Sequence, residues 1–189
     1  MKKIIKLNYE ILFERFGGGS ARLVAIAKDT VTEADMERIV SICNQPEVKK
    51  WVTFQYATGP NGQYTIQDAK EFVKQSTKGW QEGEMFAYLV RGEYNKIVGA
   101  MGLKSPENGT AEVGYWSDTE GQGGYMTNAL NALLLASAEA GFTELYTFVK
   151  PENDSSMKLC LRAGFIGQPQ MVYVEKHDEK LLKFVRKLH

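Results

Sequence analysis

The sequence of 189 residues contains only two cysteines, only five prolines and no excess of either charge. Cys43 and Cys160 match neither the spacing of zinc ligands nor a disulfide framework, so we expect no metal site and a reducing, cytoplasmic setting. Lysine plus arginine and aspartate plus glutamate number 23 each, which argues against a nucleic-acid partner.

Long hydrophobic runs are also absent. The segment Met1–Arg15 carries lysines but no uninterrupted apolar stretch, so it does not resemble a signal peptide. No run approaches the roughly 20 apolar residues that a membrane helix needs, so no membrane partner is expected. Because 43% of the residues are apolar and the chain is long enough to bury a core, we predict a single domain over residues 1–189. Residues 1–20 would form an N-terminal strand extension with a flexible, glycine-rich linker.

Hydrophobic periodicity and turn residues predict a mixture of strands and helices, which is typical of a layered α/β or α+β domain. Thr32 and Thr65 each precede an apolar helical face and are typical helix N-caps. The aromatic, turn-rich stretch from Trp51 to Tyr64 is expected to be a loop. Residues 179–188 fit a helix or a strand. The other predicted strands cover residues 4–16, 22–27, 86–90, 97–103, 111–116, 145–149 and 165–174, and the predicted helices begin near Thr32, Thr65, Tyr125 and Ser155.

The segment from Ala111 to Leu130 is the most informative part of the chain. A strand with β-branched and aromatic residues runs through the turn Gly121–Gly124 into a helix. Glycines allow close approach of a ligand, and the first amide groups of a helix attract anions, so this turn can bind a phosphate. It has neither the Rossmann glycine spacing nor the lysine of a P-loop. From the turn alone, a phosphate site and an ordinary loop both remain open.

The stretch E-V-G-Y-W-S-D, followed by the glycine turn and G-Y-M-T-x-A-L, resembles the acyl-CoA-binding motif of the GNAT N-acetyltransferase superfamily. It is most similar to the branch that includes ribosomal-protein N-terminal acetyltransferases. Three further stretches resemble that branch and follow in the family's order, from about Ala21 to the C-terminus. They are Asn44–Val48, Lys96–Leu103 and Asn153–Phe165.

The resemblance implies a mixed, mostly antiparallel sheet flanked by helices, in which two adjacent parallel strands splay apart and admit acyl-CoA. In this sequence those strands would be Glu112–Ser117 and Leu145–Val149, and residues 179–188 would form the final strand. The implied activity is acetyl-CoA-dependent transfer of an acetyl group to a primary amine by direct attack on the thioester. The acceptor would be a small molecule or a protein N-terminus, and a homodimer is a common assembly in this family.

Acetyl transfer needs a neutral amine, stabilisation of the oxyanion and a proton for the leaving thiolate. Glu112 is the candidate general base, although it could equally pair with a cation. The resemblance places an oxyanion-binding amide near Trp116 or Ser117, whose side chains would line the pantetheine arm. Many family members have a tyrosine at the position of Cys160, so Cys160 is a candidate proton donor. Its alternative role is that of a small buried residue packed in the helix.

The glycine turn departs from the family pattern, because Gly121 stands where arginine or glutamine is usual and Gln122 is displaced by one position. This departure, together with Cys160, leaves open a non-catalytic acyl-CoA-binding or regulatory module. A phosphate-binding protein unrelated to CoA is a further alternative. The residues expected to bind the cofactor are Trp116, Ser117, Gly121, Gln122, Gly123, Gly124, Tyr125, Met126, Thr127, Asn153 and Ser156, with Asn153 alternatively a helix cap.

Aromatic residues precede the second predicted helix, which in the family lies over the acceptor pocket. Trp51, Phe54 and Tyr56 are therefore the candidate substrate-binding residues, because aromatic rings can hold a cationic amine. They could equally pack the loop in which they lie. The sequence leaves the acceptor open among peptide N-termini, amino acids, polyamines and antibiotic amines.

Overall fold

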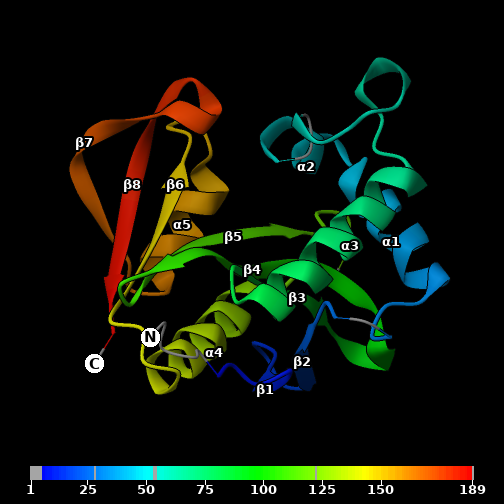
Figure 1. The fold of residues 1–189 in the computed structure, drawn as a ribbon, viewed down its shortest axis with the longest axis horizontal. Coiled ribbons are helices and arrows are strands. Elements are labelled where there is room, and N and C mark those ends of the chain that lie inside the picture. The colour runs from blue at the N-terminus through cyan, green and yellow to red at the C-terminus, as the bar shows by residue number, and fades with distance from the viewer. Residues whose placement is uncertain (1–5, 28, 53–54, 122, 189) are drawn as a thin grey trace.

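The computed structural model describes residues 6–27, 29–52, 55–121 and 123–188. An eight-stranded sheet runs through the molecule in the order β1-β2-β3-β4-β5-β6-β8-β7 (Figure 1). All neighbouring strands are antiparallel except β5 and β6, which are parallel. The strands are β1 (Glu10–Glu14), β2 (Ser20–Ala25), β3 (Met85–Arg91), β4 (Ile97–Glu107), β5 (Thr110–Ser117), β6 (Glu144–Val149), β7 (Ile166–Val174) and β8 (Glu179–Lys187).

Five α-helices and three short 3-10 turns connect the described strands. Helices α1 and α3 lie together against β3 and β4, whereas α4 lies beneath β1 and β4 on the opposite face (Figure 1). The predicted N-caps are confirmed, because Thr32 and Thr65 each form a reciprocal capping box with the aspartate three residues later. The helices are α1 (Glu33–Cys43), α2 (Pro46–Trp51), α3 (Ile66–Glu82), α4 (Met126–Glu139) and α5 (Asp154–Arg162), and the turns are η2 (Pro60–Gly62), η3 (Glu93–Asn95) and η4 (Glu175–His177).

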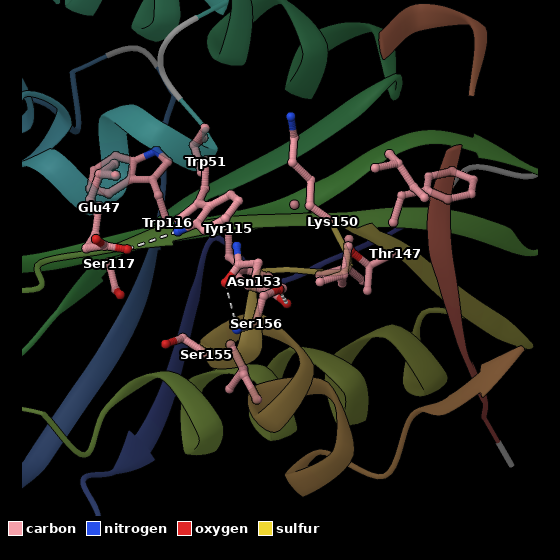
Figure 2. A pocket seen from close by; sticks show the side chains of 18 of the residues that line it. Glu47, Trp51, Tyr115, Trp116, Ser117, Thr147, Lys150, Asn153, Ser155 and Ser156 are labelled. Carbon is pink, nitrogen blue, oxygen red and sulfur yellow. Dashed lines mark hydrogen bonds between the residues drawn. The ribbon is translucent and has the colours of Figure 1, made fainter. Parts of the chain in front are cut away.

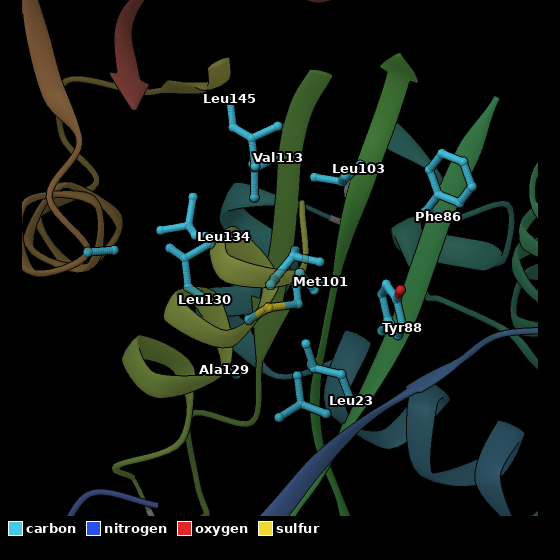
Figure 3. Packing of buried hydrophobic residues seen from close by; sticks show 14 of the residues in the cluster. Leu23, Phe86, Tyr88, Met101, Leu103, Val113, Ala129, Leu130, Leu134 and Leu145 are labelled. Carbon is cyan, nitrogen blue, oxygen red and sulfur yellow. The ribbon is translucent and has the colours of Figure 1, made fainter. Parts of the chain in front are cut away.

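The hydrophobic core is divided by the sheet into two clusters. The larger cluster packs α4 and α5 against the sheet, with Leu130 and Leu133 of α4 fully buried beside Leu145 of β6 (Figure 3). The second cluster packs α1 and α3 against the other face, around Ile39 and Leu89. The central strands β3, β4 and β5 contribute residues to both clusters, because successive side chains of a strand point to opposite faces. Among the described residues, no helix is both long and apolar enough to cross a membrane.

The fold agrees with the predicted mixed, mostly antiparallel sheet, and residues 179–187 form a strand. Two local features were not predicted. Pro46–Trp51 forms the short helix α2, which begins with proline at a position where its missing amide hydrogen costs nothing. Gly17–Gly19, expected to be a flexible linker, forms the tight turn of the β1–β2 hairpin, in which all three glycines have positive φ values of 91–99°.

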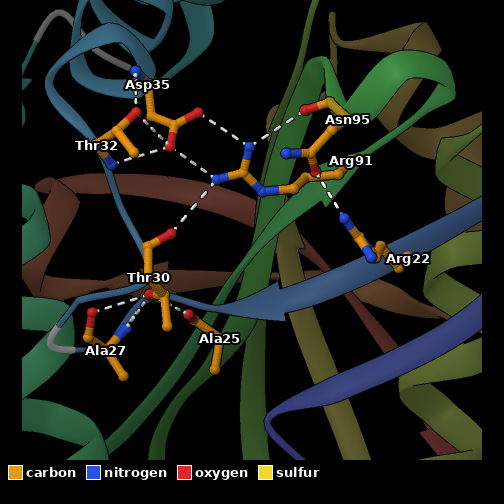
Figure 4. A network of polar contacts seen from close by, with 8 residues as sticks. All are labelled: Arg22, Ala25, Ala27, Thr30, Thr32, Asp35, Arg91 and Asn95. Carbon is orange, nitrogen blue, oxygen red and sulfur yellow. Dashed lines mark hydrogen bonds and ion pairs between the residues drawn. The ribbon is translucent and has the colours of Figure 1, made fainter.

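A buried ion pair ties α1 to the end of β3. The Arg91 guanidinium donates to both carboxylate oxygens of Asp35, each at 2.9 Å, and also to the carbonyls of Asn95 and Thr30 (Figure 4). Burial alone would raise the pKa of Asp35, but hydrogen bonds from Arg91 and Thr32 outweigh it and hold the pKa below its ordinary value. The pair therefore contributes stability whenever the Asp35 carboxyl is ionised.

Replacing Arg91 by leucine should lower the free energy of unfolding by about 3 kcal/mol, because a partly buried carboxylate loses its partner. Arg22→Leu is the matched control, since the Arg22–Glu10 pair is exposed and should cost less than about 1 kcal/mol. Chemical denaturation at several pH values measures both. The Asp35 contribution is lost as pH falls through its lowered pKa, so the wild type and Arg91→Leu should converge below about pH 4. Equal losses of unfolding free energy in Arg91→Leu and Arg22→Leu would contradict a stabilising role of the Arg91–Asp35 pair.

Candidate active site

The parallel strands β5 and β6 are paired over only three positions. The last pair is Glu112 with Tyr146, yet β5 continues to Ser117 and β6 continues to Val149. Both strands keep their antiparallel partners on the other side, so the two halves of the sheet diverge beyond this pair. The splay predicted for residues 112–117 and 145–149 is present.

A cavity of about 640 Å³ occupies the splay. Its walls come from β5, β6, α2 and the first turns of α5, with Glu47 and Trp51 on one side and Asn153 and Ser156 on another (Figure 2). A cavity of this size is typical of a small-molecule site. The predicted site residues that line it are Trp51, Tyr56, Glu112, Trp116, Ser117, Met126, Asn153 and Ser156.

The remaining predicted residues lie elsewhere. Cys160 is fully buried in α5 and does not line the cavity. Phe54 and Gln122 fall outside the described residues. The described residues of the glycine turn and the start of α4 lie beside the cavity without lining it; they are Gly121, Gly123, Gly124, Tyr125 and Thr127.

The N-terminal hairpin holds the glycine turn from behind. Arg15 Nε donates to the carbonyl of Gly123 at 3.1 Å, and the Phe16 amide donates to the carbonyl of Gly124 at 2.9 Å. Because a trans peptide directs its carbonyl and amide in opposite directions, the amides of Gly124 and Tyr125 point away from the hairpin. Together with the open first turn of α4, they form an arrangement that fits a pyrophosphate.

The other end of this turn is anchored by Asp118. Its carboxylate accepts hydrogen bonds from Gln45 Nε2 at 2.7 Å, from the Glu120 amide and from Arg38 of α1. Burial raises the pKa of Asp118, but the Gln45 hydrogen bond and the Arg38 charge outweigh it, so the pKa lies below its ordinary value. The Gln45 side-chain oxygen also accepts from the Thr119 amide. The entry to the turn is therefore fixed to α1 and to the start of α2.

A buried cluster of hydroxyl and thiol groups lies where β5 faces α5. The Tyr115 hydroxyl oxygen is 2.7 Å from Ser156 Oγ and 3.2 Å from Cys160 Sγ. Burial raises the pKa of Tyr115 and also that of the Cys160 thiol, so both groups stay protonated at neutral pH. Ser156 borders the cavity, whereas Cys160 lies behind Tyr115, and this geometry favours packing as the role of Cys160.

One wall of the cavity carries aromatic and acidic groups. Trp51 Nε1 donates to Glu47 Oε2 at 3.0 Å within α2 (Figure 2). Partial burial raises the pKa of Tyr56, and the Glu112 carboxylate raises it further, which shows that these two groups lie within electrostatic reach. Asn153 Oδ1 accepts from the Ser156 amide and caps α5, as the alternative interpretation of Asn153 proposed.

Sequence reasoning did not assign a role to Tyr115 or Arg162. In the sequence, Tyr115 served only as an aromatic residue that favours a strand. Its contacts with α5 depend on tertiary packing. Arg162 lines the cavity, and its Nε donates to Thr127 Oγ1 in the first turn of α4 at 3.2 Å. The Arg162 guanidinium lies at the N-terminal end of α4, and this end of a helix attracts anions. A cation placed there is the feature that could have identified Arg162.

The chain is similar to known acetyltransferases. A family model described as an acetyltransferase (GNAT) domain matches residues 29–166. The ribosomal-protein-serine acetyltransferase of Escherichia coli K12 is 32% identical over 124 residues, covering 62% of this chain and 67% of that protein. Mycobacterium smegmatis RimJ in complex with CoA-disulfide has a TM-score of 0.77 at 17% identity, covering 94% of this chain and 87% of its own. A Salmonella typhimurium acetyltransferase that modifies the N-terminal serine of L7/L12 has a TM-score of 0.71 at 19% identity, covering 89% and 95%.

This chain therefore belongs to the GNAT acetyltransferase family. It is an acetyl-CoA-dependent N-acetyltransferase of the branch that contains the ribosomal-protein N-terminal acetyltransferases. The predictions of family, fold, enzymatic activity and cofactor are confirmed, and the non-catalytic alternative is set aside.

Gly124→Ala should weaken acetyl-CoA binding about tenfold, because Gly124 has a φ of +91° and its added Cβ would lie 3.2 Å from the Phe16 carbonyl oxygen. Gly83→Ala is the matched control at the end of α3, where φ is +69° and nothing lies within 4 Å of the added atom. Both variants should lose about 1–2 kcal/mol of stability from the left-handed backbone. Calorimetric titration with acetyl-CoA distinguishes the two variants. Equal dissociation constants for Gly124→Ala and Gly83→Ala would contradict a role of the glycine turn in binding acetyl-CoA.

Ser156→Ala and Cys160→Ala both remove a partner of the Tyr115 hydroxyl, but only Ser156 borders the cavity. We expect kcat to fall about 10²-fold in Ser156→Ala, the effect of losing a proton donor. In Cys160→Ala we expect kcat to stay within about twofold of wild type, with about 1 kcal/mol less stability. Steady-state thiol release and denaturation measure both quantities. A large loss of kcat in Cys160→Ala would instead support the thiol as the donor.

Proposed function

We propose that this enzyme acetylates the α-amino group of a protein N-terminus, and that its acceptor belongs to the ribosomal proteins. The observation that carries the proposal is the splay beyond Glu112 and Tyr146, with Glu112 and Ser156 lining the same cavity. The names of the relatives support the choice of acceptor, since the Escherichia coli and Salmonella typhimurium proteins are ribosomal-protein acetyltransferases.

The residues present fit acetyl-CoA, which supplies an acetyl group activated as a thioester. The amides of Gly124 and Tyr125 and the Arg162 guanidinium would hold the pyrophosphate at the start of α4. Trp116 and Ser117, at the unpaired end of β5, would line the path of the pantetheine arm. These groups would place the thioester between the diverging strands.

Glu112 is the proposed general base. It occupies the last paired position of β5, where the cavity begins, so its carboxylate meets an amine that enters from the side of α2 and Tyr56. The base, directly or through a water, removes a proton from the ammonium form, because only the neutral amine attacks. Backbone amides near Trp116 and Ser117 would then stabilise the oxyanion without any change of side-chain position.

The leaving thiolate would take its proton from Ser156, and the serine would regain a proton from water in the cavity in the same step. The Ser156 hydroxyl is held by the Tyr115 hydroxyl at 2.7 Å and stands in the first turn of α5, capped by Asn153. Tyr115 acts as a positioning residue in this scheme, because its buried ring fixes one orientation of the serine hydroxyl. The cluster supplies a neutral donor close to the cavity without the tyrosine that many family members carry at the position of Cys160.

We place the reaction in the cytoplasm, consistent with two buried free thiols, Cys43 and Cys160. We further propose a homodimer formed through β7. This strand is at the edge of the sheet and exposes apolar side chains, a pattern that natural proteins usually cover. The exposed residues are Ile166, Met171, Val172 and Tyr173.

The test is thiol release from acetyl-CoA with synthetic peptides that carry ribosomal-protein N-termini, compared with the same peptides blocked at the α-amine. Turnover should require the free α-amine. Glu112→Gln should lower kcat about 10²-fold, since it removes the base without changing the shape of the side chain. Glu107→Gln, an exposed position on the adjacent strand, is the control and should be silent. Equal rates with blocked and free peptides would exclude N-terminal acetylation.

A further inference from the structure

A row of three positions without large side chains crosses the sheet on the face beneath α3. Ala87 of β3 is opposite Gly102 of β4, and Gly102 is opposite Gly114 of β5. Directly opposed residues project to the same face of a sheet, so these three positions form a trough one residue wide. The adjacent rows carry larger side chains, among them Met85 and Lys104 on one side and Leu89 and Trp116 on the other.

Helix α3 covers this trough. Its residues Asp68, Glu71, Phe72 and Gln75 face the sheet at helical spacing, and between them and the sheet lies a second cavity of about 520 Å³. The Phe72 ring and the glycine floor make its centre apolar. Asp68 is already engaged, since its carboxylate accepts from Thr58 Oγ1 and caps α3, so it does not require a ligand.

The trough opens into the splay at its β5 end. Gly114 is the first residue on this face of β5 beyond the last pair with β6, and it lines both cavities. Tyr56 and Trp116 also border both. A group attached to the reacting amine at the splay can therefore extend directly beneath α3.

Lys104 of β4 lines both cavities, and the end of its side chain lies over Gly114. Its Cε and Nζ lie 3.0 and 3.1 Å from the position that a Cβ on Gly114 would take. The aliphatic stem of Lys104 adds apolar surface to the wall of the passage. Gly114 thus keeps the passage open because it has no side chain of its own.

We infer that this trough binds the side chain of the acceptor's first residue, and that the enzyme selects acceptors in which that side chain is large and apolar. The inference rests on the proposed function, in which the acceptor amine enters at Glu112. A serine or alanine would leave most of the 520 Å³ unfilled, whereas a leucine or phenylalanine would exchange water for contacts with Phe72 and the glycine floor.

The experiment compares kcat/KM for four octapeptides that differ only in the first residue: serine, alanine, leucine or phenylalanine. A matched series of free amino-acid amides with the same four side chains is measured in parallel. In each series that turns over, we expect kcat/KM for the leucine and phenylalanine substrates to exceed kcat/KM for the serine and alanine substrates by at least about tenfold. A gain of this size is usual when a side chain fills an apolar pocket.

Ala87→Leu fills the trough from its β3 end and should abolish this preference, lowering kcat/KM for the phenylalanine peptide at least about tenfold and leaving the serine peptide within about twofold. Ala34→Leu makes the same chemical change at an exposed position of α1 and should leave the preference intact. Acetyl-CoA binding by Ala87→Leu, measured by calorimetry, reports whether the variant remains folded. Phe72→Ala, which removes the roof instead, should weaken the same preference if Ala87→Leu fails to fold.

Equal or greater rates with serine and alanine would overturn the inference and leave N-terminal acetylation intact. If only the amino-acid amides turn over and they show the preference for leucine and phenylalanine, the trough is supported and the proposed peptide acceptor is overturned. Turnover of neither series would overturn both. A preference that persists in both Ala87→Leu and Phe72→Ala would place the selective pocket elsewhere and overturn the assignment.

Discussion

The short parallel pairing of β5 and β6 is the constraint on which the rest of the site depends. Three residue pairs, ending at Glu112 and Tyr146, hold the two halves of the sheet together at this seam. Each strand is paired for longer with its antiparallel neighbour, β5 with β4 and β6 with β8, and those ladders set different strand directions (Figure 1). Sheet twist then opens the seam toward the carboxyl ends of the parallel strands. The cavity exists because the two strands are no longer hydrogen-bonded to each other beyond this pair.

The pleat of β5 divides the chemistry between the two faces of the sheet. Tyr115 points toward α5 and meets Ser156 among the larger core cluster. Glu112, Gly114 and Trp116 alternate with it and border the face covered by α3. A single strand therefore presents the proposed base and one wall of the acceptor trough on one side, and on the other side the tyrosine that positions Ser156. This arrangement separates the entering amine from the leaving thiolate while keeping both near one thioester.

The sequence predicted those helices and strands that depend on interactions between residues close together in the chain. The capping threonines, Thr32 and Thr65, and the strand–glycine–helix pattern could be read because each depends on neighbours within a few residues. Helix α2 was missed because six residues give too little periodicity to be distinguished from a turn-rich loop. Gly17–Gly19 were read as a flexible linker because the contact beside them, from the Phe16 amide to the carbonyl of Gly124, joins residues about a hundred positions apart in the chain.

The sequence by itself determined the family, the order of elements and the residue types at the candidate site, because these follow from periodicity and from motifs that are contiguous in the chain. Only the tertiary structure decided which of those residues meet. It placed Cys160 behind Tyr115 and away from the cavity. It also aligned Ala87, Gly102 and Gly114 into one row. Both outcomes depend on strand register and helix packing, which are set by contacts between distant segments and are not encoded in any local pattern.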